Sequence, residues 1–219
     1  MKKIVLSIAI LFVLSYLYSC SSVTTVSGTW KKPATSAKKY NKIAVIGLSG
    51  DIVKRSAVEK AIVSKLLASG INAVAGTSIL PDSFVDGDHD GKVDDAKKEA
   101  IAAELEKQGV DGALTISLVN VKESEQYVPG TSYYTPYSGY YGFNSYYGGA
   151  YNMVNTPGYY VKNTNIFLAS NFYNLMANNE SLIWSAQTNT GNPTSLSDLA
   201  QSYATALVED FLSAGVVRK

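Results

Sequence analysis

The residues best suited to chemistry lie in one short acidic segment, Asp86-Gly87-Asp88-His89-Asp90-Gly91-Lys92-Val93-Asp94. Carboxylates stand at positions 1, 3, 5 and 9 of this segment and a glycine stands at position 6, which is the spacing of a calcium-binding loop. Several hard oxygen ligands on a tight turn suit Ca²⁺, and a backbone carbonyl serves at position 7. We therefore predict a structural calcium site with the ligands Asp86, Asp88, Asp90, Lys92 (through its carbonyl oxygen) and Asp94.

The segment departs from the calcium-loop pattern at its end. Position 12, which normally supplies a bidentate carboxylate, is Lys97. The missing ligand would have to come from Asp82, Asp95 or Glu99. The alternative interpretation is a solvated acidic loop, whose charge is favourable at the N-terminus of the helix that follows.

Residue counts exclude several other kinds of site. One cysteine and one histidine remove most zinc, haem and iron–sulfur sites, together with Cys-His and Ser-His-Asp catalysis. Lys and Arg number 19 against 18 Asp and Glu, and this balance argues against a nucleic-acid binder, which needs a basic face. We predict no enzymatic activity. A carboxylate-based hydrolase is the remote alternative, because paired acids cleave glycosides without histidine.

Two short motifs have structural interpretations. Gly47-Leu48-Ser49-Gly50-Asp51 is neither a nucleophile elbow nor a phosphate-binding loop, because its second glycine comes one place early and no Lys-Ser/Thr pair follows at the right spacing. We interpret it as a strand-to-helix turn. Arg55 and Glu59 are one helical turn apart, so we expect them to form a surface ion pair.

A third segment, residues 127–160, has an unusual composition. It holds 11 of the 16 tyrosines, six glycines and no charged residue. Tyrosine offers an apolar face and a hydroxyl at low entropic cost, which suits protein partners and sugar rings. We therefore predict a loop that binds an envelope protein or peptidoglycan; the alternative is a variable excursion in which tyrosines pack on one another. The predicted binding residues are Tyr133, Tyr134, Tyr137, Tyr140, Tyr141, Tyr146, Tyr147 and Tyr151.

Hydrophobic patterns around these segments predict a single α/β domain over residues 40–219. Residues 42–49 form a nearly continuous apolar run, as in a strand buried on both faces, and Asp51 is placed to cap a helix that ends at Gly70. We expect further strands near 71–75, 113–121, 160–175 and 181–189, and further helices near 95–108 and 195–215. The order βαβαβββα indicates a mixed β-sheet with helices packed against it and a long Tyr/Gly-rich insertion, 127–160, between two strands.

The N-terminus has the features of a secretory signal peptide over residues 1–19. Two lysines precede an apolar run from Ile4 to Leu17. The run ends in Leu17-Tyr18-Ser19-Cys20, which resembles the lipobox of bacterial lipoproteins. The resemblance implies lipidation of Cys20, whose several acyl chains would anchor the chain stably in a membrane. The alternatives are an ordinary signal peptide and an uncleaved anchor.

The residues after Cys20 bear on location. Ser21 is not the Asp associated with inner-membrane retention, and no acidic run of the kind used for surface export follows. By resemblance, the protein is expected to be lipid-anchored at the outer membrane and to face the periplasm. Residues 20–39 are rich in Ser, Thr and Lys, and we predict that they form a flexible tether.

Motifs spread over nearly all of the mature chain resemble a widespread family of uncharacterised bacterial lipoproteins. They are Trp30-Lys31-Lys32-Pro33, 40–49 (YNKIAVIGLS), Arg55 with Glu59, 70–74 (GINAV), Leu80-Pro81, 109–114 (GVDGAL), 127–130 (YVPG) and 182–185 (LIWS). The family's α/β domain is similar to that of periplasmic assembly lipoproteins, such as the curli-secretion lipoprotein and the activator of penicillin-binding proteins. The resemblance therefore implies a fold and a location, and no activity.

These observations lead to two functional hypotheses. The first is a non-catalytic, outer-membrane-anchored lipoprotein that acts in the periplasm as an interaction or assembly module of the cell envelope. The second is a module that binds cell-wall glycan through the tyrosine-rich loop.

Overall fold

The computed structural model of the chain describes residues 23–80, 95–134, 153–176 and 181–218. They fall into two compact units. Unit 1 contains the described residues up to Val121 and those from Ile166 onward, and unit 2 contains those between Lys122 and Asn165.

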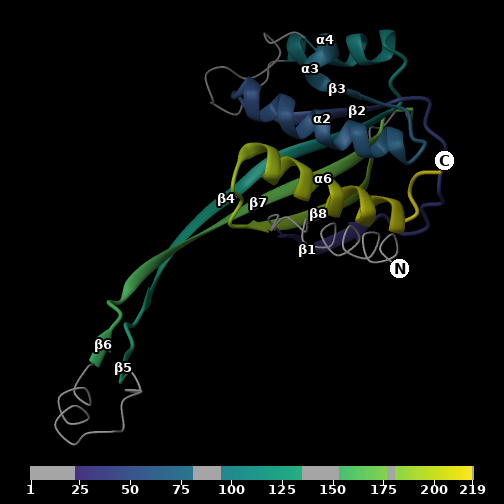
Figure 1. Ribbon diagram of the computed structural model, residues 1–219. Helices are drawn as coiled ribbons and strands as arrows, with labels where there is room; N and C mark the ends of the chain where they lie inside the picture. The colour runs from purple at the N-terminus through teal and green to yellow at the C-terminus, as the bar shows by residue number, and fades with distance from the viewer. Residues whose placement is uncertain (1–22, 81–94, 135–152, 177–180, 219) are drawn as a thin grey trace, which may run out of the picture. The chain divides into compact units, whose positions relative to one another are not determined.

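A six-stranded sheet organises the fold, and its strand order is β1-β8-β7-β4-β2-β3 (Figure 1). Strand β2 pairs in parallel with both β3 and β4, whereas β1 pairs antiparallel with β8. The fold is thus a mixed α/β sheet with helices packed against it, as the sequence predicts. The strands are β1 (Val23–Lys31), β2 (Ile43–Leu48), β3 (Ala73–Ala75), β4 (Gly112–Val128), β7 (Tyr159–Asn174) and β8 (Ser181–Gly191).

Two long helices, α2 (Ile52–Ala68) and α6 (Leu196–Ser213), cover one face of this sheet and pack against each other (Figure 1). Each begins at a side-chain cap. The Asp51 carboxylate accepts hydrogen bonds from the amides of Val53 and Lys54 at 3.1 Å, and the Ser195 hydroxyl accepts one from the amide of Asp198. Such caps satisfy amides that the first helical turn leaves without partners.

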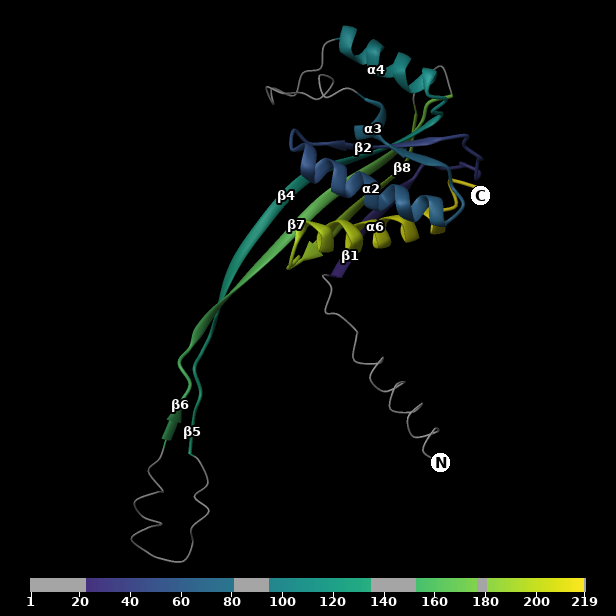
Figure 2. The same ribbon diagram turned by 45° about the horizontal axis from the view of Figure 1, so that its top comes forward.

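Strand β2 is buried on both faces, and its alternate side chains enter two separate cores. Ile43 and Val45 join the large core beneath α2 and α6, whereas Ala44 joins a smaller one with Leu105 of α4 (Asp95–Lys107). Figure 2 accordingly shows α4 on the other side of β2 from α2. The short helix α3 (Gly76–Ile79) follows β3 directly.

Residues 23–31 differ from the expected tether, because they form the edge strand β1. Val23 pairs with Gly191 and Lys31 pairs with Trp184, with a register shift between Val26 and Gly28. Five of its nine residues are valine or threonine, and such β-branched residues favour extended pairing. The threonines and the serine also make the segment polar, and a Ser/Thr-rich composition is typical of a linker, so the strand is not evident from the sequence.

Two further elements lie where the sequence predicts only an insertion. Strand β4 continues to Val128, beyond the expected end at residue 121, and β5 (Ser132–Tyr134) pairs antiparallel with β6 (Met153–Asn155). Both ends of the 127–160 segment are therefore strand, although glycine and proline within it argue against regular structure. In the described residues, no helix is long and apolar enough to span a membrane.

A buried hydroxyl pair connects the sheet to α6. The Ser170 hydroxyl of β7 lies 2.5 Å from the Tyr203 hydroxyl of α6, and both residues are completely buried. Burial raises the pKa of Tyr203 far above its ordinary value, against the smaller opposing effect of the hydrogen bond with Ser170. In the folded protein the Tyr203 phenol therefore stays protonated and neutral.

We predict that Tyr203→Phe lowers the free energy of unfolding by about 1 kcal/mol at pH 8, because it removes one buried hydrogen bond. A pKa that is raised on folding stabilises the native state below the unfolded-state pKa of about 10 and loses this contribution as the pH rises. Between pH 8 and pH 11 the free energy of unfolding of the wild type should therefore fall by about 1.4 kcal/mol through this residue, and that of the variant should not. Urea denaturation of both proteins at both pH values measures this. The same difference between wild type and variant at pH 8 and pH 11 would contradict a raised pKa of Tyr203.

Candidate functional site

Unit 1 contains an apolar pocket of about 380 Å³ where α2 and α6 begin, over strands β4 and β7. Ile116 and Leu118 of β4 are two residues apart, as are Ile166 and Leu168 of β7, so each pair projects from one face of its strand. The remaining lining residues are Gly47, Leu48, Ser49, Lys54, Arg55, Val58, Val121, Pro193, Ser195, Leu196 and Leu199.

Large apolar side chains are exposed among the lining residues. Leu48 is 59% exposed and Leu118 is 58% exposed. Exposed leucines beside an apolar pocket are typical of a surface that binds an apolar group.

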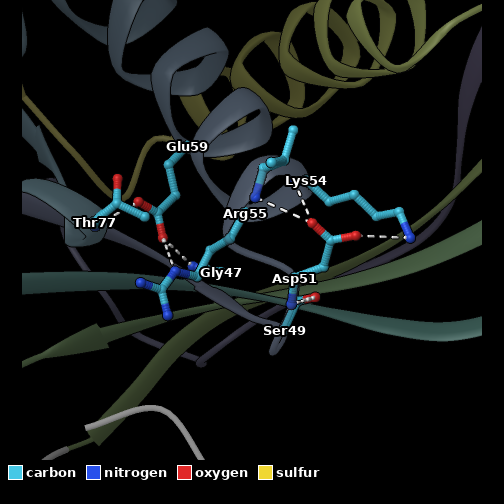
Figure 3. Close-up of polar contacts among 8 residues, drawn as sticks. Gly47, Ser49, Asp51, Lys54, Arg55, Glu59 and Thr77 are labelled. Atoms are coloured by element: carbon cyan, nitrogen blue, oxygen red, sulfur yellow. Dashed lines mark hydrogen bonds and ion pairs between the residues drawn. The ribbon is translucent and has the colours of Figure 1, made fainter. Parts of the chain in front are cut away.

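A buried carboxylate fixes one wall of the pocket (Figure 3). Glu59 is completely buried, and its Oε1 and Oε2 accept hydrogen bonds from the amides of Gly47 at 2.8 Å and Thr77 at 2.7 Å. Arg55 Nε lies 3.8 Å from Glu59 Oε1. The carboxylate thus joins α2 to the end of β2 and the start of α3.

The ion pair between Arg55 and Glu59 therefore forms, but the expectation that it lies at the surface is wrong. Arg55 is 6% exposed and Glu59 is 0% exposed. Gly47 explains the close approach, because a Cβ atom at this position would lie 2.8 Å from Arg55 Cγ. The spacing of four residues on a helix indicates that Arg55 and Glu59 can form an ion pair. It does not indicate that another segment of the chain, here the one at Gly47, buries that pair.

A second, exposed ion pair lies at the start of α2. Lys54 Nζ is 3.0 Å from Asp51 Oδ2, and Figure 3 shows the two side chains facing each other. Hydrogen bonds from the Lys54 amide and from its side chain lower the pKa of Asp51, which stays ionised as the helix cap. Lys54 is thereby held beside the pocket with its charge balanced.

The lining residues determine what the pocket can do. Those that the structure describes include no Asp, Glu, His or Cys, so they supply no carboxylate or imidazole for acid–base catalysis and no metal ligand set. Its polar groups come from two serines, Lys54 and Arg55. The pocket is therefore suited to holding an alkyl chain or an apolar side chain.

Unit 2 forms a different candidate site, which we call the tyrosine ribbon: residues 122–134 and 153–165. Tyr127 and Tyr160 have ring centroids 5.1 Å apart and are 54% and 68% exposed. Gly158 makes room for the Tyr127 ring, because a Cβ there would collide with the phenol. Lys162 and Glu125 form an exposed ion pair at 3.2 Å. The ribbon thus presents aromatic rings and mixed charges to solvent.

Most site residues predicted from the sequence lie outside the described residues. This applies to the lipidation site Cys20, to the calcium ligands Asp86, Asp88, Asp90, Lys92 and Asp94, and to Tyr137, Tyr140, Tyr141, Tyr146, Tyr147 and Tyr151. Tyr133 and Tyr134 are in β5, opposite Val154 and Met153. Lipidation and calcium binding stay predictions.

Sequence reasoning missed the pocket and the exposed tyrosine pair. The pocket is assembled from four distant stretches of the chain, so no local motif marks it. The sequence gives only a weak signal for the pocket. Apolar residues such as Leu48 and Leu196 lie at the ends of elements, where polar residues are usual. The sequence predicts Tyr127 and Tyr160 as the limits of an insertion, whereas β4 continues past Tyr127 and β7 begins before Tyr160.

No family model matches the chain, and no curated protein matches it in sequence. Among solved structures it is similar to the PelC dodecamer from Paraburkholderia phytofirmans, at 14% identity and a TM-score of 0.45, over 90% of this chain and 100% of that one. It is also similar to lipoprotein GNA1162 from Neisseria meningitidis, at 14% identity and a TM-score of 0.40, over 78% of this chain and 98% of that one. At this identity the likeness concerns the fold alone.

We predict that Glu59→Gln destabilises the protein by about 3–5 kcal/mol, because it removes one charge of a buried pair and turns an amide group toward a backbone N–H donor. The matched control is Glu104→Gln. Glu104 pairs with Lys107 on the exposed side of α4, where an ion pair is worth about 1 kcal/mol or less. Urea denaturation of the two variants gives the comparison, and equal losses would contradict a structural role for Glu59.

Proposed function

We propose that the chain is a non-catalytic module of the bacterial cell envelope, anchored by lipid on Cys20 to the outer membrane and facing the periplasm. Its task is to bind another protein, and the tyrosine ribbon of unit 2 is the binding element. The lipobox-like Leu17-Tyr18-Ser19-Cys20 supports the anchor.

The observation that carries the proposal is the exposure of the ribbon. Every ribbon residue from Lys122 to Tyr127 on β4 is exposed, and so are Tyr159 and Tyr160 at the start of β7. A two-stranded ribbon is only marginally stable in water, because it lacks a core of its own. Exposed aromatic rings on such an element gain burial when a partner covers them, and tyrosine is enriched at protein interfaces for this reason.

The ribbon favours a protein partner over a glycan. Tyr127 and Tyr160 are tilted by 51° against each other, so they do not form a flat platform for stacking one sugar ring. The neighbouring Lys162–Glu125 pair adds charges of both signs, as in the polar rim of a protein interface. Cell-wall glycan is therefore the second candidate, supported by the exposed tyrosines alone.

We predict that replacing Tyr127 and Tyr160 by alanine together abolishes partner recovery after chemical crosslinking in cells, with the melting temperature of unit 1 unchanged. The matched control is Lys162→Ala, which removes an exposed charge from the same ribbon and should lower recovery by less than about threefold. Recovery of the same partner by the tyrosine variant would contradict the assignment. Co-sedimentation of the soluble domain with purified peptidoglycan, lost in the tyrosine variant, would identify glycan as the ligand.

We also predict that the mature protein carries diacylglycerol and an amide-linked acyl chain on Cys20, whereas Cys20→Ala leaves a precursor without lipid. Intact-mass spectrometry of protein purified from membranes measures this directly. A mature protein cleaved at another site, with a free Cys20 or without it, would show that the segment is an ordinary signal peptide.

A further inference from the structure

We propose that the apolar pocket of unit 1 binds one of the acyl chains carried by Cys20 of the same molecule. The inference rests on the lipidation in the proposed function and adds a binding site for the lipid itself. The occupant is thus a part of this chain that precedes the described residues.

The composition of the pocket fits a hydrocarbon chain. Its wall is made by leucine, isoleucine, valine and proline side chains from both helices and from β4 and β7. Within the described parts of the chain no carboxylate lines the pocket, and Asp51 neutralises the charge of Lys54 at 3.0 Å. A volume of about 380 Å³ is that of a small ligand pocket.

The register of β1 brings the chain to this pocket. Val23 is paired with Gly191, and Pro193, two residues farther along, lines the pocket. The Thr24 hydroxyl is 2.7 Å from that of Thr190, and Ser202 of α6 donates to it at 2.9 Å. These bonds fix the N-terminal end of β1 beside the first turns of α6.

The side chains of α6 connect this anchor point to the pocket. Leu199 lies one helical turn before Ser202, and both Leu199 and Leu196 line the pocket. Ser202 contacts β1 directly, so the turn of helix that holds β1 is adjacent to the turn that forms the pocket wall.

The stretch of chain between Cys20 and β1 is short compared with an acyl chain. Val23 follows Cys20 by three positions, a stretch that spans at most about 11 Å. An acyl chain is about 15 Å long, since two opposed leaflets make a hydrocarbon layer of about 30 Å. Attachment to the same molecule also gives the chain a high effective concentration at the pocket, which a free lipid or a partner segment does not have.

Binding of one chain has a consequence for anchoring. A lipoprotein with several acyl chains keeps its membrane attachment when one of them is withdrawn, whereas a single chain anchors only marginally. The pocket would therefore take up one chain and weaken, but not abolish, the hold of the membrane.

The test uses the full-length lipidated protein, produced in cells fed a fatty acid with a terminal photoreactive diazirine and purified in detergent. After illumination, peptide mass spectrometry should place intramolecular crosslinks on the pocket segments around 116–121, 166–168 and 193–199. Leu199→Arg should lower their yield by at least about tenfold, because a charge in the pocket opposes an alkyl chain. The control Leu67→Arg changes a leucine of α2 that is 51% exposed and is absent from the pocket lining, so its yield should match the wild type.

The outcomes separate this inference from the proposed function. Intact mass reports lipidation independently, so lipidated protein without crosslinks in the pocket overturns the inference and leaves the anchor in place, whereas unmodified Cys20 overturns the anchor. A further arm exposes Cys20→Ala protein to vesicles of phosphatidylethanolamine with the same photoreactive chain. Labelling of the pocket there, at the yield of the lipidated protein, would make membrane lipid the occupant and overturn the assignment to the protein's own chain.

Discussion

The buried carboxylate of Glu59 is the interaction on which the arrangement of unit 1 depends. It accepts hydrogen bonds from the amides of Gly47 and Thr77, so one side chain of α2 holds both the end of β2 and the start of α3. A buried charge of this kind is tolerated only when it is paired and hydrogen-bonded, which explains Arg55 one turn earlier and the glycine at position 47. The same contact holds α2 against the end of β2, and the first turns of α2 form one side of the apolar pocket.

The pocket and the tyrosine ribbon suit the two units to different parts of the proposed function. Unit 1 has a packed core, a fixed N-terminal edge strand and an apolar pocket that is partly open to solvent, all of which suit the proposed binding of a lipid on Cys20, three positions before β1. Unit 2 consists, in its described residues, of paired strands with exposed tyrosines and an exposed ion pair. Burial of these side chains against a partner would stabilise unit 2. The proposed function, attachment to a membrane and binding of a partner, would use both properties.

Much of unit 1 could be predicted from the sequence, because its signals are local. The apolar run before Gly47 shows a strand buried on both faces, and Asp51 and Ser195 mark the helix starts that the structure confirms. The misses have physical causes. Strand β1 is polar because its edge position leaves one side open, so its composition looks like that of a linker. The burial of Arg55 and Glu59, like the pocket, depends on segments far away in the chain, which no window of sequence contains.

The claim that the tyrosine ribbon binds a protein is tested most directly by site-specific photocrosslinking in living cells. A photoreactive phenylalanine analogue would replace Tyr160 on the ribbon or, as the reference position, the exposed Ser64 on α2. The account predicts one discrete adduct at position 160, with a single partner protein identified by mass spectrometry, and no such adduct at position 64. The same partner at both positions, or no protein adduct at position 160 in a lipidated and folded molecule, would contradict it.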